Sequence, residues 1–150
     1  MKKLLFAAAF SAALVLSASD AGAQIRKIPA EVTNGFSEKY PEAGSVEWKD
    51  RLTGFTASFV LDDVNYLANF SNDGEWESTE HEIAQEELPE AVNDGFEKSR
   101  YADWQVLSVV HIEFADESVQ YRVEVGKGDI KKRNLYFNTR GRLVKDKLTL

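Results

Sequence analysis

The side chains best suited to chemistry in this sequence are its two histidines, His81 and His111. Imidazole nitrogens bind zinc and exchange protons near neutral pH. The two histidines are far apart in the sequence, and neither has a second nitrogen or a carboxylate at the spacing of a metal-binding motif. We therefore expect both to be solvated residues of strands, and we predict no metal site.

Carboxylates are the next group that could do chemistry. Asp62-Asp63 and Asp73 with Glu75 are similar to the start of a calcium loop, but the full twelve-residue series of ligands is missing. Further glutamates between residues 75 and 87 could pair for acid–base catalysis, but no apolar pocket is evident that would raise one pKa. We interpret the first two clusters as hairpin turns and the glutamate run as a solvated sheet edge.

Motifs for nucleophilic catalysis and for cofactors are missing from the chain. It contains no cysteine, which excludes thiol catalysis and thiolate metal sites. It also lacks a Gly-x-Ser-x-Gly motif and a glycine-rich phosphate loop. We therefore predict that the protein is not an enzyme and that it needs no cofactor.

An internal repeat indicates which elements position these side chains. Residues 28–36 (IPAEVTNGF) and 88–96 (LPEAVNDGF) share an apolar residue, a proline, a valine, a glycine and a phenylalanine in register. The proline suits the first turn of a helix, and the apolar residues recur at i, i+4 and i+8. Tyr40-Pro41 ends the first helix, because the residue before a proline avoids helical geometry. Each copy is thus expected to begin with a helix that has one apolar face.

After the first helix, the hydrophobic period changes to two, which is typical of β-strands. Residues 55–61 and 64–70 alternate in this way, with Asp62-Asp63 between them as a tight turn. Asn72-Asp73-Gly74 then has the composition that a second hairpin turn requires. These patterns predict successive antiparallel strands.

The second copy repeats the same order of strands. Residues 119–125 and 131–137 alternate as a pair, and Thr139-Arg140-Gly141 takes the place of the Asn-Asp-Gly turn. The second copy is longer, and we expect its extra residues in a longer strand pair from Gln105 to Phe114. Each copy is therefore predicted to have one helix followed by four strands.

Two such copies predict an α+β fold. A single unit would bury little apolar surface, whereas two units can share one sheet. We expect two tandem α-β-β-β-β repeats, 24–84 and 85–150, that form one antiparallel sheet of about eight strands with two helices on one face. The other face of such a sheet can remain open to solvent.

The first 23 residues are typical of a signal peptide. Lys2 and Lys3 precede an apolar stretch from residue 4 to 16, which is too short to span a bilayer. Small residues then lead to a predicted cleavage site after Ala23. We expect a periplasmic or secreted protein without a membrane anchor. The formal net charge of −7 argues against nucleic acid as a partner, which would require a cationic face.

Several short motifs carry a resemblance to a known family. The pattern Pro-x-x-Val-x-x-Gly-Phe, followed by Tyr40-Pro41, Val46-Glu47-Trp48 and Asp73-Gly74-x-Trp76, resembles the PepSY-like proteins, also called β-lactamase-inhibitor-like. In the second copy Arg100-Tyr101 replaces Tyr-Pro, and Leu143 stands in place of the tryptophan. The resemblance implies the fold described above. It also implies kinship with modules that are thought to restrain secreted peptidases and with inhibitors that seat an enzyme on a concave sheet face.

The strand residues on the uncovered phase are the predicted binding residues. They are mainly amides and charged groups with one leucine and one tyrosine: Asn65, Leu67, Asn69, Gln120, Arg122, Glu124, Asn134 and Tyr136. The first hypothesis is an exported, non-catalytic binding module, inhibitory or regulatory, that presents the open sheet face to a periplasmic protein or peptide. The alternative is a periplasmic protein that binds a small ligand or a metal through the acidic turns and the histidines.

Overall fold

A computed structural model describes residues 26–128 and 130–149. The predicted signal peptide (1–23) and its cleavage site after Ala23 lie outside these residues. In the described part of the chain a helix and four strands occur twice in succession, with the short 3₁₀ helix η1 between the two sets. None of the helices described is long and apolar enough to cross a membrane. The elements are α1 (Ala30–Lys39), β1 (Gly44–Arg51), β2 (Gly54–Leu61), β3 (Val64–Ser71), β4 (Trp76–Ile83), η1 (Gln85–Glu87), α2 (Glu90–Glu97), β5 (Gln105–Phe114), β6 (Val119–Lys127), β7 (Lys131–Asn138) and β8 (Leu143–Thr149).

We refer to α1–β4 as the first repeat and to α2–β8 as the second repeat. The boundary between residues 84 and 85 remains a prediction, and η1 begins there. All eight strands form one sheet in the order β1 to β8, and each strand pairs antiparallel with the next. The tight turn between β2 and β3 has positive φ at both Asp62 and Asp63, as a two-residue hairpin turn requires. The predicted α+β fold class is therefore confirmed.

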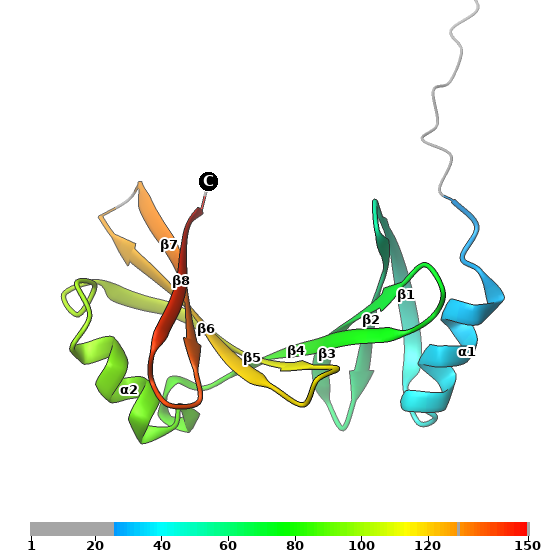
Figure 1. Cartoon of the computed structure of the whole chain (residues 1–150), viewed down its shortest axis with the longest axis horizontal. Helices are drawn as coiled ribbons and strands as arrows, with labels where there is room; N and C mark the ends of the chain where they lie inside the picture. Colours follow the sequence, from blue (N-terminus) through cyan, green and yellow to red (C-terminus); the bar gives the residue numbers. More distant parts are fainter. Residues whose placement is uncertain (1–25, 129, 150) are drawn as a thin grey trace, which may run out of the picture.

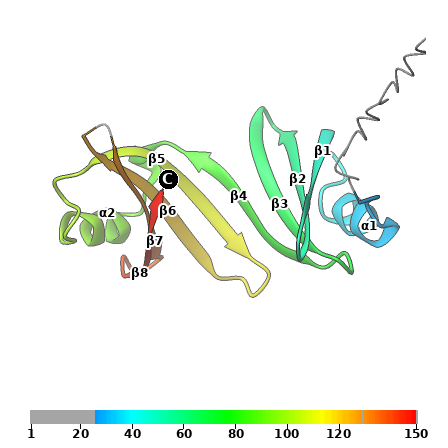
Figure 2. The same ribbon diagram turned by 90° about the horizontal axis from the view of Figure 1, so that it is seen from above.

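Both helices lie on the same face of the sheet, at its two ends (Figure 1, Figure 2). Under α1 the core contains Val32, Phe36 and the buried residues of β2 and β3. Under α2 a separate core contains Val92, Phe96 and buried residues of β5, β6 and β7. The central strands β4 and β5 join the two halves.

The repeated glycines allow each helix to contact a hairpin turn. A Cβ atom on Gly35 would overlap the carbonyl oxygen of Gly74, and one on Gly95 would overlap that of Gly141. Gly74 and Gly141 also have φ values of 84° and 76°, which favour glycine. The glycine that the two helices share is thus explained by the close approach of backbone to backbone in both repeats.

The sheet is bent into a U, with β4 and β5 at its floor and the helices outside its arms (Figure 1). Register shifts interrupt the ladders at Asn69/Phe70 and at Tyr136/Phe137, which are matching positions of the two repeats. Similar shifts occur at Gly44/Glu47 and at Val106/Ser108. Because bulges bend strands and increase their twist, these four irregularities help to curve the sheet. The face without helices is therefore concave.

One expectation about the second repeat is wrong. Gln105 to Phe114 is not a strand pair but the single ten-residue strand β5. This segment contains no turn-forming glycine, proline or asparagine, so it continues as one strand and pairs with β4 on one side and β6 on the other. The extra residues of the second repeat are spread over β5 and the loops beside it.

Candidate functional site

The predicted binding residues all lie on the concave face. Directly opposed residues of antiparallel strands share a face of the sheet. Leu67 is opposite Ser58 and Glu80, and Arg122 is opposite Val110 and Tyr136. The buried core residues occupy the alternate positions of the same strands. The phase deduced from the alternation is therefore the phase that the helices leave open, while the binding role of these residues remains a proposal.

The eight predicted residues form two groups on different arms of the U. Asn65, Leu67 and Asn69 lie on β3, in the first repeat. The other five lie on β6 and β7, where Arg122 is opposite Tyr136 and Glu124 is opposite Asn134. Strands β4 and β5 lie between the two groups.

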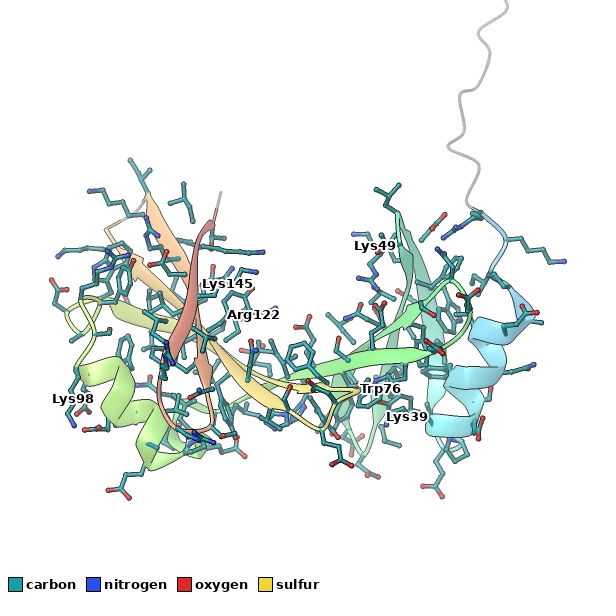
Figure 3. All side chains as sticks on the ribbon, in the orientation of Figure 1. Lys39, Lys49, Trp76, Lys98, Arg122 and Lys145 are labelled. Atoms are coloured by element: carbon teal, nitrogen blue, oxygen red, sulfur yellow. The ribbon has the colours of Figure 1, made fainter. Side chains whose placement is uncertain are left out.

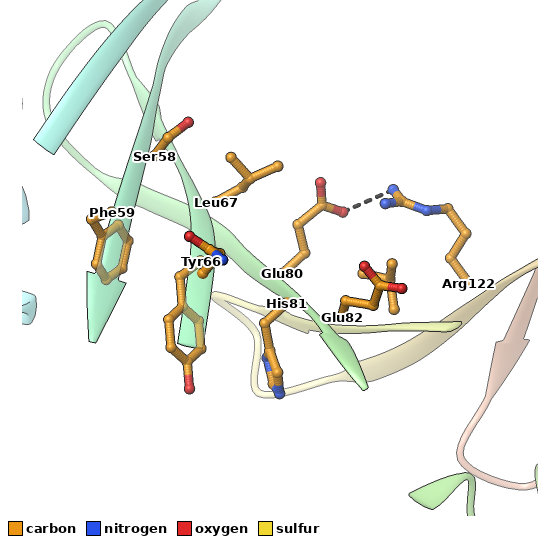
Figure 4. A pocket seen from close by; sticks show the side chains of 10 residues that line it. Ser58, Phe59, Tyr66, Leu67, Glu80, His81, Glu82 and Arg122 are labelled. Atoms are coloured by element: carbon orange, nitrogen blue, oxygen red, sulfur yellow. Dashed lines mark hydrogen bonds and ion pairs between the residues drawn. The ribbon is translucent and has the colours of Figure 1, made fainter. Parts of the chain in front are cut away.

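An ion pair lies between the two groups, at the floor of the U. The Arg122 Nη1 atom donates a hydrogen bond of 2.8 Å to Glu80 Oε2, across the strand β5 that separates them (Figure 4). The Glu80 and Arg122 side chains are only 18% and 27% exposed. In the ladder, Glu80 is opposite Ile112 and Arg122 is opposite Val110. Ile112 is buried although no helix covers this face. The ion pair thus covers apolar residues at the centre of the concave face.

The ion pair lines a shallow depression of about 420 Å³. Leu67 is 39% exposed at one side of it. Figure 4 shows Leu67, Glu80 and Arg122 on one side of the ribbon, with the rings of Tyr66 and His81 on the other. The depression therefore offers an aliphatic contact and a charged pair side by side, the mixture expected of a recognition surface.

Glu80 was missed by the sequence interpretation, which placed the glutamate run at a solvated sheet edge. That interpretation is wrong, because β4 is a central strand with β3 and β5 on its two sides. Two other carboxylates of the run accept hydrogen bonds within the chain. Glu77 accepts one of 3.0 Å from Arg51, and Glu87 accepts one of 2.7 Å from the Ala84 N–H. The alternation of Ser78, Glu80 and Glu82 in one phase was a signal for the open face, but strand order could not be read from it.

The two arms of the concave face differ in their number of lysines, since the first-repeat arm has Lys49, opposite Thr56, whereas the second-repeat arm has three. On the second-repeat arm, Lys132, Lys145 and Lys147 lie in register with Gly126, Tyr136 and Asn134. None of these lysines takes part in an ion pair among residues 26–128 and 130–149. Lys147 lowers the pKa of Lys145, first through direct side-chain contact and then through charge repulsion. We call these three residues the lysine patch; it is basic although the chain as a whole is acidic.

Exposed aliphatic side chains lie at the tips of both arms. Leu52, in the β1–β2 turn, is 96% exposed, and Ile130, in the β6–β7 turn, is 91% exposed. Both hairpins point to the open side of the U (Figure 1).

The face that carries the helices holds the two histidines. His81 on β4 and His111 on β5 are directly opposed, with ring centroids 5.2 Å apart. The two histidines lack a metal-motif spacing in the sequence, but the pairing of β4 with β5 brings them together in the fold. Burial lowers the pKa of His111, and the charge of His81 acts in the same direction. No group of three or more possible metal ligands is found among residues 26–128 and 130–149.

Comparisons with known proteins agree with this architecture. A family model described as "Putative beta-lactamase-inhibitor-like, PepSY-like" matches residues 55–145. None of the curated proteins matches the chain.

Solved structures with the same fold come from several Bacteroides species. A BLIP-like protein from Bacteroides fragilis is 30% identical, with a TM-score of 0.70 over 80% of this chain and 85% of that chain. A DUF2874 family protein from Bacteroides ovatus is 25% identical, with a TM-score of 0.74 over 80% and 86% of the two chains. A structure named as putative periplasmic proteins from Bacteroides eggerthii is 24% identical, with a TM-score of 0.74 over 80% and 88%, and shows the fold alone.

Proposed function

This chain belongs to the PepSY-like, beta-lactamase-inhibitor-like family, and from that premise we propose that it is an exported, non-catalytic module that binds a protein or peptide on its concave face. The observation that carries the proposal is the helix-free concave surface, which has an aliphatic contact and a half-buried ion pair at its centre. An inhibitory or regulatory role is supported by the family description and by the name of the Bacteroides fragilis protein.

The charge of the concave face indicates what kind of partner it accepts. The lysine patch lies on one arm. Lysines that make no ion pair within residues 26–128 and 130–149 favour a partner that brings carboxylates to them. Tyr136, opposite Lys145, adds an aromatic contact of the type that often dominates binding energy. The first-repeat arm instead offers the amides of Asn65 and Asn69 beside Leu67. On its strand β1, the charge of Lys49 is offset by Glu47 on the same face. We therefore propose that the partner presents an acidic segment to the second-repeat arm and a less charged one to the first.

The export part of the proposal rests on the first 23 residues and on a solved relative that is named as periplasmic. Expression of the full chain in a Gram-negative host, followed by fractionation and N-terminal sequencing, tests it. We expect a periplasmic product that begins at Gln24. An intact chain that stays in the cytoplasm would contradict export without affecting the binding proposal.

Binding on the concave face is tested by matched charge reversals. The chain is immobilised and exposed to a periplasmic extract of its host, and captured proteins are compared between the parent and two variants. Lys145→Glu changes the inside of the concavity, whereas Lys98→Glu changes the outer side of α2 (Figure 3). We expect a partner that is retained by Lys98→Glu and lost by Lys145→Glu.

Two further variants check the centre of the surface. Leu67→Glu places a charge at the aliphatic contact, and Tyr136→Ala removes the aromatic ring, and both positions are away from the helix-covered cores. Each is expected to weaken capture of the same partner while the urea midpoint stays within the range of the parent. Capture that is equal for all four variants would refute the concave face as the binding surface.

Metal binding stays the alternative function, and one observation favours it. The acidic turns contribute no group of three possible ligands within residues 26–128 and 130–149. The two histidines, in contrast, are brought into contact by the sheet.

A further inference from the structure

A row of rings crosses the helix-covered face in the space between α1 and α2. It runs over five successive strands, from Phe59 on β2 through Tyr66, His81 and His111 to Tyr121 on β6. Neighbouring ring centroids are 5.6, 4.9, 5.2 and 5.4 Å apart. The phenylalanine belongs to the first core, whereas both histidines are only half-buried. At its centre this row therefore presents two imidazoles to solvent.

The spacing of the two imidazoles fits a shared metal ion. Zinc–nitrogen bonds to histidine are about 2.0–2.1 Å long, and tetrahedral coordination then places the centroids of two bound imidazoles about 5 Å apart. The His81 and His111 centroids are 5.2 Å apart. We propose that His81 and His111 together bind one divalent transition-metal ion of borderline softness, such as Zn²⁺, Ni²⁺ or Cu²⁺.

We expect water to fill the remaining coordination positions, because no third possible ligand is grouped with the two histidines among residues 26–128 and 130–149. Glu113 lies two residues after His111, on the same face of β5, and is exposed. Its charge attracts a cation to this part of the face. Tyr66 and Tyr121 flank the pair on either side and limit how far the imidazoles can turn away from each other. A site with two protein nitrogens and open positions binds more weakly than a closed structural site.

The place of this site in the fold gives the metal a structural effect. His81 is on the last strand of the first repeat, and His111 is on the first strand of the second repeat. A bound ion would therefore link the two repeats at the junction of the sheet, in a chain that has no cysteine for a disulfide. Since the ion binds only the folded pair, it should raise the midpoint of thermal unfolding.

The chain has only two histidines, so their signals report on the site directly. Imidazole NMR spectra of the tag-free chain are recorded while Ni²⁺ is added below one equivalent, and Zn²⁺ binding is measured by calorimetry. We expect both histidine signals to broaden together, one Zn²⁺ per chain, and a higher unfolding midpoint with Zn²⁺. Separate broadening of the two histidines, or no saturable Zn²⁺ binding up to about millimolar concentration, would overturn the proposal.

Variants that keep the ring row test the ligands. His81→Phe and His111→Phe each retain a ring but remove the nitrogens, and each is expected to weaken Zn²⁺ binding about tenfold or more. Glu82→Gln is the matched control, since Glu82 follows His81 on β4 but is opposite Val110 on the concave face, and its Zn²⁺ affinity should equal that of the parent. Unchanged affinity in both histidine variants would refute the site. If a phenylalanine variant does not fold, the Ni²⁺ spectra of the parent still decide the question, independently of any partner on the concave face.

Discussion

The core of the first repeat is rich in aromatic rings, whereas that of the second is mainly aliphatic. Phe36 has its centroid between 5.0 and 6.0 Å from four other rings. Its counterpart Phe96 packs among buried aliphatic residues such as Val109, Val123 and Leu135. The order of elements is nevertheless the same in the two repeats, each with a helix held against a hairpin turn by paired glycines. The comparison teaches that the glycine contacts and the alternation specify this fold, while the filling of the core can vary.

A second difference concerns the tyrosine that follows each helix. Tyr40 shares a hydrogen bond with the Thr79 hydroxyl, whereas Tyr101 donates one of 2.7 Å to the Asp146 carboxylate. Asp146 also accepts bonds from Arg100 and Arg133, of 2.5 and 2.8 Å. The same structural position is thus neutral in the first repeat and ionic in the second.

The largest expected effect comes from truncating the central phenylalanines. Phe36→Ala and Phe96→Ala should each lower the free energy of unfolding by about 3–5 kcal/mol. The loss at Phe36 should be the larger, because its edge-to-face ring pairs contribute beyond burial. Urea unfolding of both variants measures the difference. A larger loss at Phe96 would show that the aromatic ring pairs do not make the first core the more stabilising of the two.

Substitution of the helix glycines should destabilise both repeats to a similar degree. Alanine normally favours a helix over glycine by about 1 kcal/mol. At Gly35 and Gly95 the added Cβ would meet a turn carbonyl, so we expect Gly→Ala to destabilise each by about 1–3 kcal/mol. Gly44→Ala is the control, because its Cβ would meet nothing within 4 Å. Stabilisation by either helix substitution in urea unfolding would show that the turns do not need this contact.

Removal of the tyrosine hydroxyl should lower the free energy of unfolding more at the ionic position than at the neutral one. Tyr101→Phe removes a hydrogen bond to a charged group and should cost about 1.5–3 kcal/mol, whereas Tyr40→Phe removes a neutral one and should cost about 0.5–1.5 kcal/mol. Both variants keep the ring, so packing is matched. Equal losses in chemical unfolding would mean that the charge of Asp146 does not strengthen its bond to Tyr101.

The smallest expected effect is on the pH dependence of stability. The Tyr101 hydroxyl and then Arg100 lower the pKa of Asp146 in the folded state. Its ionised form therefore stabilises the fold above the usual carboxyl pKa of about 4, and this contribution is lost as the pH falls through the lower folded value. Urea midpoints at pH 6 and pH 3 should differ less for Asp146→Asn than for the parent. Thr79→Val, at the matching neutral position, should leave that difference unchanged.

Much of the fold could be predicted from local patterns. The Pro-x-x-Val-x-x-Gly-Phe motif predicted both helices, and the alternation around Asp62-Asp63 predicted β2 and β3 with their turn. The strand pair expected between Gln105 and Phe114 was wrong, because alternation alone does not reveal whether an uninterrupted run is folded back. The edge position assigned to the glutamates of β4 was wrong for a related reason, since strand order is a long-range property.

The sequence by itself determined the two helices, the repeat and the phase of every predicted binding residue, because these depend on periods of 3.6 and 2 within short segments. Only the tertiary structure decided which residues meet. The pairing of β4 with β5 unites His81 with His111 on one face and brings Glu80 within reach of Arg122 on the other. Only the bending of the sheet made the open face concave, because twist and bulges accumulate over all eight strands.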